Sequence, residues 1–182
     1  METISTMGSG SLGRELSLEV LVSEIQASLG QSVDANFTSD SIVTFRLDED
    51  GPAYTVYRTG TFQVRGAKSK EKLKAAEDAF LDVLDGIGVD VEEYEFEHVT
   101  SVFMTDLEQD MNLTTLAVSL GLETVEYEPE QFPGLVCRPD DFECVLLVFG
   151  SGKVVITGGR NKSAAKRALD WLVAQIDRPQ KN

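Results

Sequence analysis

The chain contains an internal repeat, and this feature constrains its fold more than any other. At an offset of 92 positions, Arg46 aligns with Arg138 and Asp48 with Asp140. The same offset, without a gap over about 20 residues, brings together Val56 and Val148, Tyr57 and Phe149, Gly60 and Gly152, Val64 and Ile156, and Gly66 and Gly158. A period near half of the 182 residues predicts two copies of one supersecondary unit, not a solenoid.

Each copy contains the same series of strand-like and helix-like segments. Three runs predict strands in each copy, at 42–47, 53–57 and 61–65 in the first and at 135–138, 143–149 and 153–157 in the second. An amphipathic helix closes each copy, with Ser69 and Ser163 as the expected N-caps. Antiparallel strands with helices on one face predict an α+β architecture.

The segments that precede these strands are less regular. Alternation predicts strands at 16–25 and 94–104, and helical spacing predicts a helix at 107–120. The Ser/Gly-rich residues 1–14 are expected to form a flexible tail. The expected organisation is therefore a tail (1–14), a first repeat (15–91) and a second repeat (92–178).

The charge of the chain is strongly and unevenly negative. Asp and Glu number 31 against 16 Lys and Arg, which gives a net charge of −15. The windows 46–74 and 138–167 each carry +3, which leaves −21 for the rest of the chain. The total argues against a protein that coats nucleic acid by neutralising phosphates. The basic windows also fit ordinary solvated helix faces.

Several classes of protein are disfavoured by what the sequence lacks. Hydrophobic residues make up 42%, which is typical of a packed core and not of a disordered acidic segment. Two cysteines without a matching His or Cys cluster argue against a zinc site and favour a reducing, cytoplasmic location. No nucleophile pattern accompanies the single histidine, so we expect no enzymatic activity and no cofactor.

Three segments resemble archaeal TATA-box-binding proteins. They are Glu126–Val136, Val148–Gly158 and, in the first copy, Gly66–Ser69. The resemblance covers about residues 16–178 and implies a two-repeat saddle, with a curved antiparallel sheet of about ten strands, helices on the convex face and a concave face that binds the minor groove of DNA. Such proteins insert apolar wedge side chains between base steps, so their binding to DNA depends less on the neutralisation of phosphates. The acidic body also resembles haloarchaeal proteins, whose salty cytoplasm screens surface charge.

In the second copy the resemblance implies a nearly complete DNA-binding set. Phe132 and Phe149 match the wedge positions, Leu147 and Val155 the apolar floor, Thr157 a small hydroxyl at the groove, and Arg138 and Lys153 phosphate contacts. The alternative is that Phe132 only caps a loop and that Phe149 belongs to the core.

The first copy departs from the family pattern. Asp40 stands at the first wedge position and Tyr57 at the second, and Gln63 and Arg65 stand at the positions of Val155 and Thr157. Where the family places an asparagine in each copy, the first copy has Val20 and the second has His98. A carboxylate at a wedge position would repel phosphate, whereas Arg46 and Arg65 would hold phosphate or enter a narrow A·T-rich groove. One kink, an altered sequence preference and no DNA binding all stay open.

The resemblance also implies a protein partner. Glu126, Tyr127, Glu128 and Glu130 match the surface that docks transcription factor B, although they also fit ordinary solvated acids. The first hypothesis is thus a transcription initiation factor or regulator that binds A·T-rich promoter DNA at the nucleoid. The alternative is an interaction module that binds or sequesters transcription factor B, or self-associates as a homodimer, without TATA-box binding.

Overall fold

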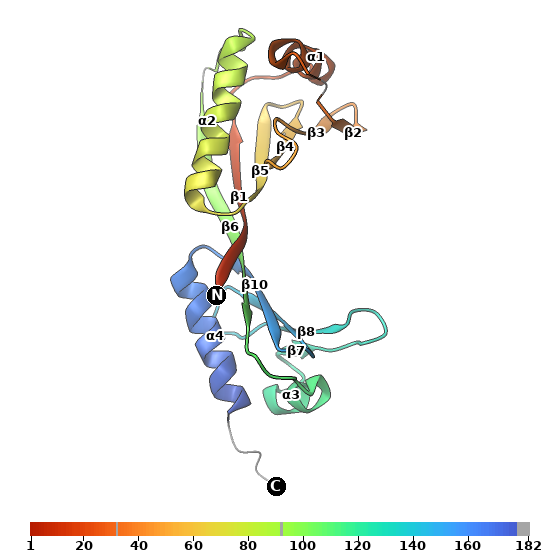
Figure 1. Ribbon diagram of the computed structural model, residues 1–182, viewed down its shortest axis with the longest axis vertical. Helices are drawn as coiled ribbons and strands as arrows, with labels where there is room; N and C mark the ends of the chain where they lie inside the picture. The colour runs from red at the N-terminus through yellow and green to blue at the C-terminus, as the bar shows by residue number, and fades with distance from the viewer. Residues whose placement is uncertain (32, 92, 178–182) are drawn as a thin grey trace. The chain divides into compact units, whose positions relative to one another are not determined.

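The computed structural model describes residues 1–31, 33–91 and 93–177 (Figure 1). Within this part, the chain divides into two compact units. The N-terminal unit comprises Ser5–Val99, and the C-terminal unit comprises Met1–Ile4 together with the described residues from Thr100 onward. Residues 92 and 178, at which the second expected repeat begins and ends, lie outside the described residues.

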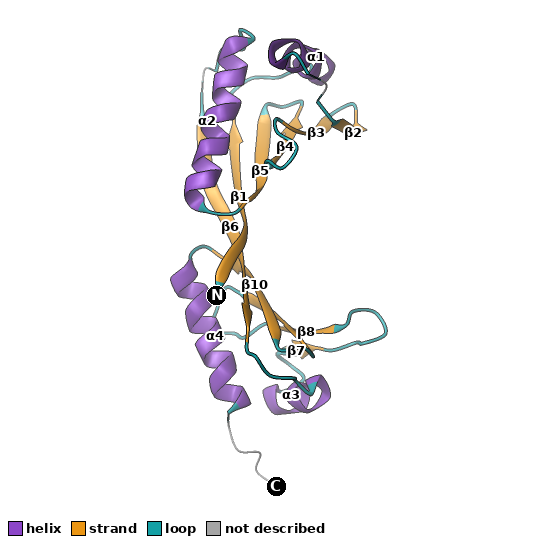
Figure 2. Ribbon diagram, viewed as in Figure 1, coloured by secondary structure: helices purple, strands orange, loops and turns teal. Residues whose placement is uncertain are grey.

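The N-terminal unit is a layer of antiparallel strands covered by two helices. In chain order its elements are β1 (Glu2–Ser11), α1 (Leu18–Leu29), β2 (Ala35–Ser39), β3 (Ile42–Arg46), β4 (Ala53–Tyr57), β5 (Thr61–Ala67) and α2 (Lys70–Gly86). The strands pair in the order β2-β3-β4-β5-β1-β6, where β6 is Glu95–Asp106. Figure 2 shows α2 lying along one side of these strands.

The C-terminal unit repeats this plan with the strand order β6-β10-β9-β8-β7. Its elements after β6 are α3 (Leu113–Leu120), β7 (Val125–Glu126), β8 (Gly134–Cys137), β9 (Val145–Phe149), β10 (Lys153–Gly159) and α4 (Lys162–Ile176). Together the described strands form a single ten-stranded sheet. The α+β class and the number of strands agree with the expectation from the sequence.

Each unit has its own hydrophobic core between strands and helices. In the N-terminal unit Phe45, Tyr54 and Phe62 surround Phe80 of α2 with ring centroids 5.1–6.2 Å from it. In the C-terminal unit Leu172 of α4 is fully buried in the cluster that contains Leu146 and Val154. The helix-covered face of each half of the sheet is thus the one that carries the core.

The expected flexible tail at 1–14 is wrong, because Glu2–Ser11 form strand β1. This strand pairs with β5, from Thr6 opposite Ala67 to Ser11 opposite Thr61. Its core-facing positions include Gly8 and Gly10, which lie against aromatic rings from neighbouring strands. Because rings from the neighbouring strands fill the space above these glycines, β1 lacks the apolar alternation by which a strand is recognised in a sequence.

The expected strand at 16–25 is also wrong, because Leu18–Leu29 form helix α1. The apolar residues of this segment fit both a period of two and a helical period. The structure buries Leu18, Leu21, Val22 and Ile25, which share one helix face, and leaves Val20 58% exposed. Packing of the helical stripe against α2 therefore decides between the two periods.

Two details of the helices also differ from expectation. Helix α3 begins at Leu113 instead of residue 107, with the Asn112 side chain accepting a hydrogen bond from the Thr115 amide. Helix α4 is capped by Asn161 and not by Ser163, whereas Ser69 caps α2 as expected. No helix within the described part of the chain is long and apolar enough to cross a membrane.

Candidate nucleic-acid interface

The strands of each unit have a second face, which the helices do not cover. In β9, Leu146 and Val148 are buried in the core, so the alternate residues Val145, Leu147 and Phe149 point away from it. The same alternation holds in β10, where Val154 and Ile156 are buried. We call this second side the helix-free face.

An apolar row crosses the helix-free face of the C-terminal unit. Val136 in β8 pairs with Leu147 in β9, Leu147 pairs with Val155 in β10, and Val155 pairs with Met104 in β6. These four half-buried residues are the apolar row. Leu147 and Val155 were predicted, whereas Val136 and Met104 were missed, although both stand in segments predicted as strands.

An aromatic pair lies beside the apolar row. The ring centroids of Phe132 and Phe149 are 5.8 Å apart at an interplanar angle of 65°. Phe132 is 37% exposed. A Cβ atom at Gly134 would lie 2.8 Å from the Phe132 ring and 3.1 Å from the Phe149 ring, so a glycine is needed beneath the pair. The structure therefore brings the two predicted wedge residues together at the surface.

The remaining predicted DNA contacts of this unit lie on the same strands or directly after them. Lys153 is exposed at the start of β10, opposite Asp106 of β6. Thr157 is half-buried and pairs with Val145. Arg138 follows β8, and its Nε lies 3.3 Å from Oε1 of Glu126, a residue predicted for partner docking. The ion pair thus links a residue predicted to contact DNA to a residue predicted to contact the protein partner.

The N-terminal unit has polar residues at the equivalent positions of its helix-free face. Thr44 pairs with Thr55, Thr55 with Gln63, and Gln63 with Ser9. These four residues, from β3, β4, β5 and β1, are the polar row. Of these, Gln63 was singled out from the sequence, whereas Ser9 lies in the segment expected to be a tail.

Hydrogen bonds organise the polar row. The hydroxyl oxygens of Thr44 and Thr55 are 2.9 Å apart. Arg65 Nε donates to Oε1 of Gln63 at 3.1 Å, and its Nη2 also donates to that oxygen. The Ser9 hydroxyl donates to the carbonyl of Phe62 at 3.2 Å. The row is therefore an ordered set of polar groups.

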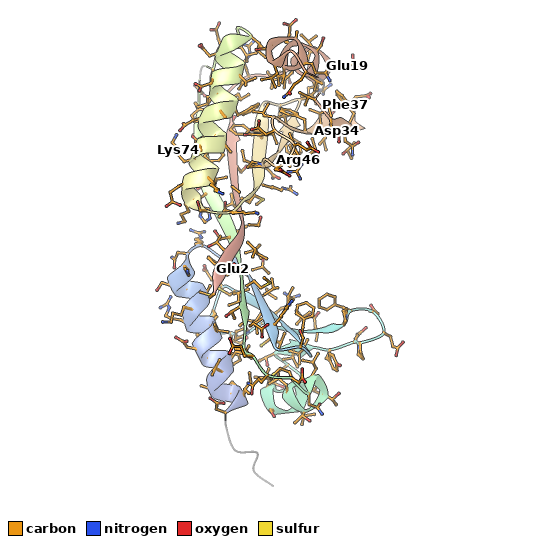
Figure 3. The ribbon with its side chains drawn as sticks, in the orientation of Figure 1. Glu2, Glu19, Asp34, Phe37, Arg46 and Lys74 are labelled. Atoms are coloured by element: carbon orange, nitrogen blue, oxygen red, sulfur yellow. The ribbon has the colours of Figure 1, made fainter. Side chains whose placement is uncertain are left out.

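The predicted residues of the first copy are dispersed around this row. Arg46 and Arg65 are exposed on the helix-free face and flank Ala53 across β3, β4 and β5. Figure 3 shows Arg46 on the side of the strands away from α2. Tyr57 is half-buried at the end of β4, opposite Ile42.

Asp40 stands where the second copy has its wedge phenylalanine, but the two backbones differ there. Ser39 of β2 pairs with Ile42 of β3, so Asp40 lies in a two-residue turn. In the C-terminal unit β7 and β8 are joined by the longer loop 127–133, which carries Phe132. The described turn between β2 and β3 thus contains only Asp40 and Ser41, and it carries no ring that could stand beside Tyr57 as Phe132 stands beside Phe149.

The expected asparagine positions are wrong in the first copy, because Val20 lies on helix α1 and not in a strand. The repeat has a different offset there. The Leu12 amide donates a hydrogen bond to the Gly60 carbonyl, and the Leu107 amide donates the equivalent bond to the Gly152 carbonyl, both at 3.0 Å. Leu12 and Leu107 are therefore equivalent, so the first strands of the two copies are related by an offset of 95 residues. At this offset His98, which is half-buried in β6, corresponds to Thr3 of β1.

The predicted partner-binding residues lie at the loop between β7 and β8. Glu126 ends β7, and Glu128 and Glu130 are exposed in the loop. Glu128 accepts a hydrogen bond from the Gln131 side chain, and its carbonyl accepts from the Phe132 amide at 2.9 Å. Tyr127 is half-buried against the core of its unit, so it supports the loop as well as lining it.

The chemistry of the described residues offers little for a metal or a nucleophile. They contain no cluster of His, Cys, Asp and Glu that could hold a metal ion. Burial raises the pKa of the Cys137 thiol to about 11, and the pKa of the Cys144 thiol is raised as well, chiefly by burial. Both thiols are therefore protonated at neutral pH and are poor nucleophiles.

Two helix-covered units, built on one plan and joined in one open sheet with a free face, define the class of two-repeat DNA-binding folds that includes the TATA-box-binding proteins. The family model described as "Transcription factor TFIID (or TATA-binding protein, TBP)" matches the chain twice, over residues 3–87 and 95–178. The chain belongs to this family of general transcription factors.

Relatives and a solved structure cover nearly the whole chain. TATA-box-binding protein C of Halobacterium salinarum is 38% identical over 97% of both chains. TATA-box-binding protein 2 of Haloferax volcanii is 37% identical over 97% of this chain and 93% of its own. The structure of Methanococcus jannaschii TBP matches with a TM-score of 0.79 at 35% identity, over 96% of this chain and 97% of its own.

Proposed function

We propose that the chain binds A·T-rich promoter DNA in the minor groove through its helix-free faces. The observation that carries the proposal is the Phe132–Phe149 pair beside the apolar row. Proteins of this family are a well-known example of minor-groove binding, in which apolar wedges unstack a base step and kink the duplex. Phe132, which is 37% exposed, and the half-buried Phe149 would supply the wedge. The neighbouring apolar row would supply the surface that lies along the groove.

The basic residues of the same faces suit the flanking phosphates. Lys153 is exposed at one edge of the apolar row, and Arg46 and Arg65 are exposed on the helix-free face of the N-terminal unit. Arg138 shares its charge with Glu126, so its contact with phosphate requires the ion pair to open or to be shared. His98, Tyr57 and Thr157 complete the proposed contact surface.

Fluorescence anisotropy with an A·T-rich duplex in molar KCl tests this function. Phe132→Ala and Phe149→Ala should each weaken binding by about tenfold or more, since a stacked ring is worth roughly 1–3 kcal/mol per base. Phe37→Ala is the matched control, because Phe37 is as exposed, at 42%, but lies opposite Val43 on the helix-covered side. Equal losses in all three variants would contradict a wedge role.

We further propose that the loop 127–133 and its neighbour Glu126 dock transcription factor B. The support is an exposed acidic loop, anchored by the half-buried Tyr127, immediately before the wedge residue Phe132. A basic partner bound there would contact the protein and the DNA next to the kink. The docking residues are Glu126, Tyr127, Glu128 and Glu130.

A pull-down with transcription factor B tests the docking surface. Glu128→Arg and Glu130→Arg should abolish or strongly reduce complex formation, because they reverse two exposed charges without touching the Glu126–Arg138 ion pair. Asp82→Arg combined with Asp85→Arg, at two exposed positions on α2, is the control, because it changes the total charge by the same amount. If the loop variants bind as the control does, docking through this loop is excluded. Binding of transcription factor B without any DNA binding would favour an interaction module.

A further inference from the structure

The two helix-free faces have equivalent strand pairing in one row of the sheet, but the side chains of that row differ in polarity. Thr44, Thr55 and Gln63 occupy the positions that Val136, Leu147 and Val155 occupy 92 residues later, with the same strand partners. Ser9 corresponds to Met104 at the offset of 95 that relates β1 to β6. Four hydrogen-bonding side chains thus replace four apolar ones in one row of the sheet.

This exchange matters because the minor groove offers few features to read. A·T and T·A pairs present acceptors there, and a G·C pair adds the 2-amino donor of guanine. The only acceptor among the side chains of the apolar row is the weakly accepting thioether sulfur of Met104. A guanine amino group pressed against Val136, Leu147 or Val155 therefore loses its water without a replacement. A buried donor left unpaired in this way is costly.

The polar row can satisfy such a donor. Each hydroxyl oxygen of Thr44, Thr55 and Ser9 keeps acceptor capacity beyond the hydrogen bonds already formed. Arg65 holds Oε1 of Gln63, which leaves the amide nitrogen of Gln63 to donate to adenine N3 or thymine O2. The row therefore presents both acceptors and a donor.

We propose that the polar row makes the N-terminal unit tolerant of G·C base pairs, whereas the apolar row restricts the C-terminal unit to A·T. Thr44, Thr55 and Gln63 are then specificity-determining residues, and the preferred site is asymmetric. Such asymmetry orients the chain on a duplex that has one A·T half and one mixed half. The inference rests on the proposed minor-groove function.

Binding of the native chain to three duplexes tests the inference without any substitution. One duplex has A·T pairs in both halves, one has G·C pairs in a single half, and one has G·C pairs in both halves. The single-half duplex should bind within about threefold of the A·T duplex, because the chain can turn its polar row to the mixed half. The double-half duplex should bind about tenfold more weakly or worse, as is usual for a mismatched pair.

An inosine control identifies the group responsible. Replacing G·C with I·C in the double-half duplex removes only the 2-amino group from the minor groove. Binding should return to within about threefold of the A·T duplex. A loss that persists with inosine would overturn the assignment to the amino group.

Paired variants test the residues themselves. The triple variant Thr44→Val, Thr55→Val, Gln63→Leu should lower the ratio of single-half to A·T affinity by about tenfold. The opposite triple variant Val136→Thr, Leu147→Thr, Val155→Gln should raise the ratio of double-half to A·T affinity. Far-UV circular dichroism verifies folding, and the native-chain measurements decide the matter if either variant does not fold.

The outcomes separate this inference from the function on which it rests. Binding to the A·T duplex with a full tenfold loss already on the single-half duplex would overturn the inference and leave the function standing. Equal binding to all three duplexes would overturn it too. Failure to bind any duplex would refute the proposed function and the inference with it.

Discussion

Tyr54 shows how a single residue couples the core of the N-terminal unit to pH. It is 2% exposed, and its hydroxyl donates to the carbonyl of Ala76 at 2.9 Å. Burial, and then the negative charge of Asp48, raise the pKa of Tyr54 to about 12. Because the folded protein holds the phenolic proton more tightly than the unfolded chain, the stabilisation is complete below about pH 10.

We therefore expect the free energy of unfolding to fall as the pH rises from about 10 to about 12. In Tyr54→Phe the decrease in the free energy of unfolding between about pH 10 and about pH 12 that is due to Tyr54 should disappear. At neutral pH the variant should be less stable by about 1 kcal/mol, because it lacks the hydrogen bond to Ala76. Urea titrations at several pH values measure both effects. An alkaline slope that is the same in the native chain and in Tyr54→Phe would contradict the assignment.

Single residues also show why part of the site escapes sequence analysis. Phe132 and Phe149 were predicted because they stand in the segments that resemble the family, and the structure places their ring centroids 5.8 Å apart. Thr44, Thr55 and Ser9 carry no such signal. Their significance comes from the strand register, which places them in one row with Gln63.

At the scale of elements, the predictable ones are those whose apolar pattern fits a single period. Strands β4 and β9, and helices α2 and α4, have this property, because their own side chains fill the core. Helix α1 fits two periods, and only its packing settles which applies. Strand β1 has glycines where core side chains would stand, so its place is filled by the rings of Phe62 and Phe96.

Strand β1 therefore gives a sharp prediction. A Cβ atom at Gly8 would lie 2.2 Å from the ring of Phe96, which stacks on Phe62 at a centroid distance of 5.6 Å. Gly8→Ala should destabilise the fold by about 1–3 kcal/mol through overpacking. Gly86→Ala is the matched control, because the added methyl meets nothing within 4 Å and improves the helix propensity of α2.

Urea unfolding followed by circular dichroism measures both variants. The midpoint should move down for Gly8→Ala and remain or move slightly up for Gly86→Ala. If Gly8→Ala is as stable as the native chain, the ring of Phe96 does not pack on β1 as the structure has it.

At the scale of the whole molecule, we expect the excess of acidic residues to oppose folding. Lys74 and Arg138 form ion pairs with Asp78 and Glu126, but the net charge is still −15. Repulsion among like charges destabilises a compact state. Salt weakens it, because the screening length falls from about 10 Å at 0.1 M to about 3 Å at 1 M.

We expect the melting temperature to rise steadily between 0.1 M and 2 M KCl, by about 2–4 °C for each kcal/mol of repulsion that is relieved. The triple variant Asp82→Asn, Asp85→Asn, Asp90→Asn removes three exposed charges from the N-terminal unit and should melt higher than the native chain at 0.1 M. At 2 M the two proteins should differ little, because screening has already removed the repulsion. If neutralisation raises the melting temperature equally at both concentrations, or lowers it at 0.1 M, like-charge repulsion is not what makes the protein depend on salt.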